Sequence, residues 1–203
     1  MKRLLALFVL IVASAAAHAE APVILVFGDS ISAGYGLPLE QGWVELLRTR
    51  LKAQGYGYQV VNASISGETT AGGLARLPRA LDLHHPGIVI LELGGNDGLR
   101  GLPIAQMRTN LTQMTNLSTA AGAKVLLLGM RMPPNYGPEY TKQFAMVFSD
   151  LAANKKAALV PFLLTNIALS PGLLQGDDIH PNALGQPILL DNVWPNLKAL
   201  LHK

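Results

Sequence analysis

The sequence predicts an α/β fold in which a parallel sheet is covered by helices on both faces. Short apolar runs alternate along the chain with longer segments that carry apolar side chains at helical spacing. The first run, Val23–Phe27, is too short for a helix and is closed by Gly28, which is typical of a fully buried parallel strand. Because parallel strands need right-handed crossover connections, the helices lie on both sides of the sheet, and a three-layer architecture follows.

Five strands are predicted from the apolar runs, and helices from the segments between them. The strands are expected at Val23–Phe27, Tyr58–Ala63, Ile88–Leu93, Lys124–Leu128 and, most weakly, Ala158–Phe162. The helices are expected at Trp43–Gln54, Leu74–His84, Pro103–Ala121, Glu139–Lys155 and from Asn182 to the C-terminus. Gly55 ends the first helix and Pro103 begins the third, as a glycine after a helix and a proline in its first turn commonly do. Pro78 is expected to bend the second helix, and Pro187 and Pro195 to interrupt the last.

Length and composition predict one globular domain and exclude several functions. The chain has 203 residues, half of them apolar, and residues 20–203 are enough for a single domain with a sizeable core. Without Lys2 and Arg3, 14 basic residues face 13 acidic ones, so a nearly neutral chain with no basic block is a poor nucleic-acid binder. The absence of cysteine excludes a thiol nucleophile, disulfides and a lipid-modified N-terminal cysteine.

Residues 1–19 have the pattern of a cleaved signal peptide. Lys2 and Arg3 form the charged region, Leu4–Ala17 the apolar region, and Ala17-His18-Ala19 an A-x-A cleavage site. A retained membrane anchor is the alternative, but the apolar run is shorter than the ~20 residues of a spanning helix. We therefore expect an exported chain without a stable membrane anchor.

Three loops that follow predicted strands carry polar or glycine residues suited to catalysis. Ser30 follows the first strand, Gly67 the second and Asn96 the third. Ligands of open α/β sheets bind at the carboxyl ends of the strands, so these three residues should meet at one edge. A fourth segment, Asp177-Asp178-Ile179-His180, lies near the C-terminus.

A serine hydroxyl needs a neighbouring base to act as a nucleophile, and histidine is suited to that role. His180 is the histidine with an acid at useful spacing within a loop, whereas His84 and His85 end a predicted helix and His202 is next to last. Asp177, three residues earlier, can reach the imidazole on a tight turn and fix its tautomer, and Asp178 is the competing candidate.

An acyl-transfer site also needs donors for the oxyanion. The backbone N–H groups of Ser30 and Gly67 and the side-chain amide of Asn96 are the candidates. Each residue has an ordinary structural alternative: a helix N-cap for Ser30, and a turn for Gly67 and Asn96. Their order on successive strand ends is more specific than any one of them.

These residues resemble the four sequence blocks of the SGNH, or GDSL-type, hydrolases. The blocks are Gly28-Asp29-Ser30, the single Gly67, Gly95-Asn96-Asp97 and Asp177-x-x-His180, in the family's order over essentially the whole mature chain. The chain looks most like the exported bacterial thioesterase/arylesterase/lysophospholipase group. The resemblance implies a flavodoxin-like αβα sandwich with strand order 2-1-3-4-5. It also implies a triad of Ser30, Asp177 and His180, and an oxyanion hole of Ser30, Gly67 and Asn96.

The expected function is therefore that of a serine esterase acting through an acyl-serine intermediate on small-molecule or lipid acyl esters, including aryl esters, acyl thioesters and lysophospholipids. The enzyme is expected to be a periplasmic monomer, with secretion to the medium as the second choice. A carbohydrate acetylesterase, or a non-catalytic lipid- or carbohydrate-binding module, is the alternative. No cofactor or metal is expected, since Gly28–Gly36 lacks the P-loop and dinucleotide-binding spacings and the acids around His180 are too few for a metal site.

Overall fold

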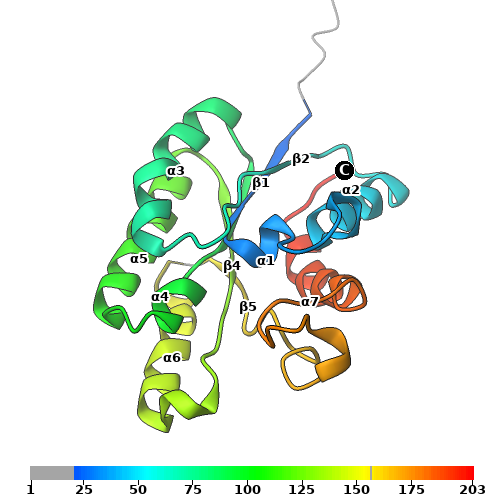
Figure 1. The fold of residues 1–203 in the computed structure, drawn as a ribbon. Helices are drawn as coiled ribbons and strands as arrows, with labels where there is room; N and C mark the ends of the chain where they lie inside the picture. Colours follow the sequence, from blue (N-terminus) through cyan, green and yellow to red (C-terminus); the bar gives the residue numbers. More distant parts are fainter. Residues whose placement is uncertain (1–20, 156) are drawn as a thin grey trace, which may run out of the picture.

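The computed structural model describes residues 21–155 and 157–203, so the predicted signal peptide, residues 1–19, lies outside the described residues. A parallel five-stranded sheet runs through the centre in the order β2-β1-β3-β4-β5 (Figure 1). The strand order of the predicted flavodoxin-like sandwich is thereby confirmed. The strands are β1 Val23–Gly28, β2 Gln59–Asn62, β3 Ile88–Glu92, β4 Lys124–Leu128 and β5 Ala158–Val160.

The central strands are buried on both faces, which explains their unbroken apolar sequences. Ile24 to Phe27 of β1 are fully inaccessible, and β3 is buried along its whole length. In the register of β1 and β3, Gly28 lies opposite Glu92, so an acid ends the otherwise apolar strand β3. An acid at that place is costly to bury unless it finds hydrogen-bonding partners.

Two groups of helices cover the two faces of the sheet (Figure 1). One face carries α3, α5 and α6, and the other carries α2 and α7, with α3 contacting α5, α5 contacting α6, and α2 contacting α7. These helices are α2 Trp43–Ala53, α3 Thr70–His84, α5 Ile104–Ala120, α6 Pro138–Lys155 and α7 Gln186–Lys198. Within residues 21–155 and 157–203, no helix has the length and apolar character needed to cross a bilayer.

Two short α-helices were not predicted, and several boundaries differ from the prediction. The last helix ends at Lys198 and not at the C-terminus, and the fifth strand ends at Val160 and not at Phe162. Segments expected as loops form α1, Ser30–Ala33, and α4, Gly95–Leu99. Helix α3 begins at Thr70, four residues before the predicted start, because the Thr69 side chain accepts a hydrogen bond from the Gly72 N–H and caps the helix. Helix α7 begins at Gln186 and not at Asn182, whose side chain instead caps a turn through the N–H of Leu184.

The prolines disturb the helices less than the sequence suggested. Pro187 lies in the first turn of α7, where a missing N–H costs nothing. Pro78 and Pro195 lie inside α3 and α7, and both helices continue past them.

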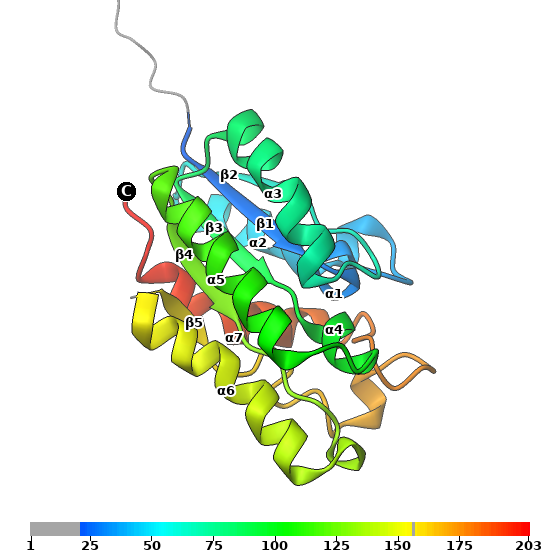
Figure 2. The ribbon, with the colours of Figure 1, turned by 90° about the vertical axis from the view of Figure 1, so that its left-hand side faces the viewer.

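The carboxyl ends of the strands bring together segments that are far apart in the sequence. Figure 2 shows α1, α4 and the chain that leads into α7 gathered at the same end of the sheet. Two hydrogen bonds join the β2–α3 loop to the end of β1. Gly28 N donates to Ser64 Oγ at 3.1 Å, and Gly28 O accepts from Ile65 N at 3.0 Å. The fold therefore places every predicted site segment at one edge.

Candidate active site

The turn between β1 and α1 holds Ser30 just beyond the central strand. Asp29 caps α1, because its Oδ1 accepts the Ile31 N–H at 3.1 Å. Gly34, with a φ of 73°, closes the single turn of α1 in a left-handed conformation that glycine adopts without strain. Ser30 is half-buried, so its hydroxyl is fixed by the turn and still accessible.

His180 lies between Ser30 and Asp177. Its Nε2 is 2.8 Å from Ser30 Oγ, and its Nδ1 is 2.6 Å from Asp177 Oδ2. A carboxylate can only accept, so Nδ1 carries the proton, and Nε2 is left to accept the Ser30 hydroxyl proton. This arrangement is the proton-transfer chain that a serine nucleophile requires.

Asp177, and not its neighbour Asp178, contacts the imidazole. Asp177 Oδ1 accepts the N–H groups of Ile179 and His180, each at 3.0 Å, which leaves Oδ2 for the ring. Partial burial raises the pKa of Asp177, but the hydrogen bonds from the His180 backbone and ring and from Ile179 N–H outweigh it and lower the pKa to about 2. Asp177 is therefore ionised at neutral pH. Asp178 occupies a left-handed turn position with a φ of 57°.

The segment that carries His180 is attached to the loop after α1 by contacts that the sequence did not reveal. Gln175 Nε2 donates to the carbonyls of Tyr35, at 2.8 Å, and Pro181, at 3.2 Å. The Tyr35 ring packs on the imidazole with a centroid distance of 4.7 Å. Gln175 and Tyr35 hold the imidazole beside Ser30, and neither residue stands at a spacing that predicts this contact.

The three candidate oxyanion donors are joined to one another through the ends of β1 and β3. Asn96 lies in α4, and its Nδ2 donates one hydrogen to Asp29 Oδ2 at 3.2 Å, so the second hydrogen has no partner among residues 21–155 and 157–203. Gly67 has a φ of 79°, and its carbonyl accepts from Arg100, directly after α4, at 2.9 Å. The Arg100–Gly67 hydrogen bond thus links the end of α4 to the Gly67 turn, and the Asn96–Asp29 hydrogen bond links α4 to the Ser30 turn.

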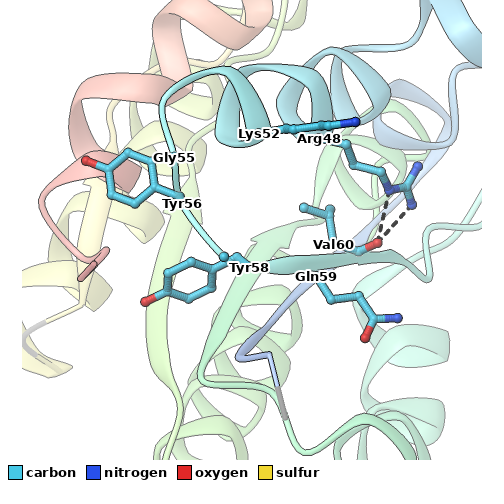
Figure 3. A pocket seen from close by; sticks show the side chains of 8 residues that line it. Arg48, Lys52, Gly55, Tyr56, Tyr58, Gln59 and Val60 are labelled. Carbon is cyan, nitrogen blue, oxygen red and sulfur yellow. Dashed lines mark hydrogen bonds between the residues drawn. The ribbon is translucent and has the colours of Figure 1, made fainter. Parts of the chain in front are cut away.

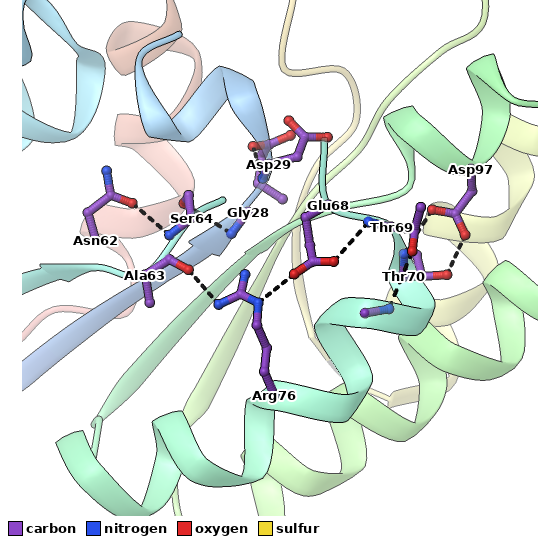
Figure 4. Close-up of polar contacts among 12 residues, drawn as sticks. Gly28, Asp29, Asn62, Ala63, Ser64, Glu68, Thr69, Thr70, Arg76 and Asp97 are labelled. Atoms are coloured by element: carbon purple, nitrogen blue, oxygen red, sulfur yellow. Dashed lines mark hydrogen bonds and ion pairs between the residues drawn. The ribbon is translucent and has the colours of Figure 1, made fainter. Parts of the chain in front are cut away.

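A partly buried ion pair joins Arg76 to Glu68 (Figure 4). Arg76 of α3 donates to Glu68 Oε2 and to the Ala63 carbonyl, each at 2.6 Å, and its guanidinium lies over the Phe27 ring. Glu68 directly follows Gly67 and also accepts the Thr69 N–H. Arg76 thereby connects Ala63 and Glu68, which lie near the two ends of the β2–α3 loop. Because Arg76 and Glu68 are eight residues apart, no local spacing rule predicts their ion pair.

A second acid, Glu92, was missed by sequence reasoning and lies behind the Ser30 turn. Its side chain is fully buried, and Oε2 accepts Asp29 N and Ser32 N, both at 3.2 Å, and Ser32 Oγ at 2.8 Å. Burial first, and then the charge of Asp29, raise the pKa of Glu92 well above its ordinary value. The available signal was an acid at the end of a strand that is otherwise fully apolar.

Asp29 also titrates abnormally. Burial raises its pKa to about 6, against hydrogen bonds from Ile31, Glu92 and Asn96 and the charge of His180, all of which favour the ionised form. Two buried carboxyl groups, those of Asp29 and Glu92, therefore accept hydrogen bonds from the residues around Ser30.

A hollow of about 590 Å³ lies at the start of β2, beside Gln59 and Val60 (Figure 3). Two tyrosines, Tyr56 and Tyr58, line it together with Lys52 and Arg48, whose guanidinium donates to the Val60 carbonyl. Ser30 and His180 do not line this hollow. Within the described residues, no group of three histidine, aspartate or glutamate side chains is placed to hold a metal ion.

Comparisons with known proteins agree with this geometry. Residues 26–188 match the model of the GDSL-like lipase/acylhydrolase family. The chain is 56% identical over 184 residues to Esterase TesA of Pseudomonas aeruginosa, covering 91% of this chain and 92% of the relative. It is 42% identical to the arylesterase of Vibrio mimicus, covering 97% of this chain and 98% of the relative.

Two further similarities extend these findings. The thioesterase 1/protease 1/lysophospholipase L1 of Escherichia coli is 41% identical, with coverage of 91% of this chain and 87% of that protein. A crystal structure of TesA superposes with a TM-score of 0.87 at 56% identity, covering 88% of this chain and 99% of that one.

Proposed function

The chain belongs to the GDSL-like lipase/acylhydrolase family, and from that membership we propose that Ser30, His180 and Asp177 are the catalytic triad of a serine esterase. The observation that carries the assignment is the hydrogen-bonded chain Ser30–His180–Asp177, with distances of 2.8 and 2.6 Å. The function itself, a carboxylic ester hydrolase, agrees with the esterase, arylesterase and thioesterase names of the relatives.

The reaction proceeds in two halves. Ser30 Oγ attacks the acyl carbonyl carbon while His180 Nε2 takes the hydroxyl proton, and Asp177 stabilises the imidazolium. The carbonyl oxygen becomes an oxyanion, which accepts hydrogen bonds from the backbone N–H groups of Ser30 and Gly67 and from the free Nδ2 hydrogen of Asn96. Collapse of the intermediate expels an alcohol or thiol, which takes the proton from His180 and leaves an acyl-serine. A water molecule then gives a proton to His180 and attacks the acyl carbon, and His180 returns the proton to Ser30 Oγ as the acyl–oxygen bond breaks and the carboxylic acid leaves.

Aryl esters, acyl esters, acyl thioesters and lysophospholipids are the proposed substrate classes. The support is the printed names of the relatives, which include arylesterase, thioesterase and lysophospholipase. We further propose that residues 1–19 are a cleaved signal peptide, that residues 20–203 form one hydrolase domain, and that the mature enzyme is a periplasmic monomer. The A-x-A site after an apolar run supports export.

Replacement of Ser30 tests the proposal. Ser30→Ala should lower kcat for a 4-nitrophenyl acyl ester by at least about 10⁴-fold, as loss of a serine nucleophile does elsewhere. Ser149→Ala, which removes an exposed hydroxyl on α6, is the matched control and should retain wild-type kcat.

A covalent label gives a second readout that does not depend on turnover. An alkyl phosphonate ester should add one phosphonyl group to the wild-type chain, located on the Ser30 peptide by mass spectrometry, and none to Ser30→Ala. A folded Ser30→Ala protein with undiminished esterase activity would refute the assignment. The same enzymes tested on acetylated sugars, longer acyl esters and acyl-CoA thioesters distinguish the esterase from a carbohydrate acetylesterase.

A further inference from the structure

Glu92 binds the backbone on both sides of Ser30 without facing the substrate. Its Oε2 accepts the N–H of Asp29, the residue before Ser30, and the N–H and Oγ–H of Ser32, two residues after it. Its Oε1 is buried and accepts no hydrogen bond within the described residues. The side chain comes from β3, so one buried carboxyl group fixes the β1–α1 turn to the neighbouring strand.

Asp29 continues this connection toward Asn96. It is 2% exposed, and it accepts Ile31 N at Oδ1 and Asn96 Nδ2 at Oδ2. Glu92 Oε2 also accepts the Asp29 N–H, so the two buried acids are neighbours behind Ser30. Because two carboxylates only accept hydrogen bonds, a hydrogen bond between these side chains requires one proton on the pair.

The surroundings place that proton on Glu92. The charged groups that face the pair are the two carboxyls themselves and, on the Asp29 side, His180. Three hydrogen bonds favour the ionised form at each of the two acids, but the charge of His180 favours it only at Asp29, whereas Glu92 is completely buried beside the negative charge of Asp29. Two neighbouring carboxyl groups at such a buried site do not both ionise, because the two negative charges would repel each other.

We infer that Glu92 is a positioning residue for ester hydrolysis: a neutral carboxylic acid whose Oε2 holds the Ser30 turn and whose Oε1 proton is donated to the Asp29 carboxylate. Asp29, kept as an anion, then accepts one Nδ2 hydrogen of Asn96 and turns the other toward the oxyanion. The inference rests on the proposed function, since it concerns the geometry of the nucleophile and of one oxyanion donor.

The chemistry of a neutral acid makes glutamine the matched replacement. The Glu92→Gln side chain keeps an acceptor oxygen for the three donors at Ser32 and Asp29, and its NH₂ replaces the Oε1 proton as a donor to the Asp29 carboxylate. Glu92→Leu has a similar volume and supplies neither group. An ionised Glu92, in contrast, would be replaced poorly by glutamine, because the charge itself would be lost.

Infrared spectroscopy tests the protonation state without any activity measurement. At pH 7, the wild-type minus Glu92→Gln difference spectrum should contain the carbonyl stretch of a protonated carboxylic acid, which is well separated from the bands of carboxylates. The same band should be present in Ser30→Ala, so this result stands or falls independently of the nucleophile assignment. A difference spectrum that contains only carboxylate bands would overturn the inference.

Kinetics tests the positioning role. Glu92→Gln should keep kcat within about threefold of wild type. Glu92→Leu should lower kcat about 10- to 100-fold with little change in KM. Removal of an oxyanion donor lowers kcat by about 10²–10³-fold, and a misplaced donor should cost no more than that. Adding Asn96→Ala to Glu92→Leu should then lower kcat little further than Asn96→Ala alone. Equal losses in Glu92→Gln and Glu92→Leu, or fully multiplicative losses with Asn96→Ala, would contradict the role. If Glu92→Leu does not fold, the infrared comparison and Glu92→Gln kinetics still decide the question.

Discussion

Replacement of Gly28 by alanine is expected to destabilise the protein and to displace Ser30, the proposed nucleophile. Gly28 ends β1 and lies opposite Glu92 in the sheet register. A Cβ added at Gly28 would lie 2.5 Å from Glu92 Oε2, 2.9 Å from the Glu92 carbonyl oxygen and 3.0 Å from its Cβ. Two of these three neighbours belong to the backbone or to the Cβ of a central strand, so they cannot move by a rotamer change.

The magnitude follows from two effects. Overpacking of a tight core costs about 1–3 kcal/mol. Displacement of Glu92 Oε2 from its donors adds about 1–3 kcal/mol for each buried polar group left without a partner. A loss of about 2–5 kcal/mol in the free energy of unfolding is a large part of the 5–15 kcal/mol typical of proteins, and it corresponds to a decrease in Tm on the order of 5–20 °C.

The assay is thermal unfolding by circular dichroism, combined with kcat for an ester substrate. Gly57→Ala is the matched control, because a Cβ at Gly57 meets no atom within 4 Å, and its free energy of unfolding should change by no more than about 0.5 kcal/mol. Gly28→Ala should melt well below Gly57→Ala, and kcat of its folded fraction should fall. If the two variants have the same Tm and the same kcat, the close contact between Gly28 and Glu92 is not needed to position the Ser30 turn, and the reasoning is refuted.

Two further predictions concern charge. Asp177→Asn should lower kcat by about 10⁴-fold with little change in KM, because an amide favours the wrong tautomer of His180. Initial-rate measurements on the wild type and on Asp177→Asn give both constants. A loss in kcat below tenfold would contradict the orienting role of Asp177. Burial raises the pKa of Asp29 from 3.8 to about 6, and burial and the charge of Asp29 raise the pKa of Glu92 well above its ordinary value. The native state therefore keeps protons that the unfolded chain releases, so the stabilisation by this pair is complete below about pH 4 and is lost as pH rises. Urea unfolding between about pH 4 and pH 8 should therefore show a smaller decline in Glu92→Gln, and parallel declines in the two proteins would refute the assignment of the raised pKa to Glu92.

The sequence was sufficient to predict the sheet, because strands that are buried on both faces have short, nearly continuous apolar sequences. The run Val23–Phe27 is apolar throughout and the region Ile88–Leu93 is apolar except for Glu92, and both are central strands in the structure. The short helices α1 and α4 leave no such record, since four or five residues span little more than one turn and show no repeat of apolar positions. Ser30 and Asn96 therefore lie on helices that periodicity could not predict.

The positions of the candidate catalytic residues were predictable from their order, but their orientation was not. Sequence spacing left Asp177 and Asp178 both open as partners of His180. The structure distinguishes them through backbone geometry, because Asp177 Oδ1 binds two N–H groups of its own turn while Asp178 takes a left-handed conformation. Such a difference depends on φ and ψ at single residues, which neighbouring letters do not determine.

The supporting residues were the least predictable part of the site, and the reason is physical. Glu92, Arg76 and Gln175 act through contacts with residues 6 to 140 positions away in sequence, so only the folded chain brings them to their partners. Each binds backbone or charge next to a residue that would touch substrate. Oxyanion donors are effective because their positions are fixed before the charge develops. A site assembled from four separate loops therefore requires buried groups that hold the loops to one another, and Glu92 at the end of β3 meets this requirement for the two loops that carry Ser30 and Asn96.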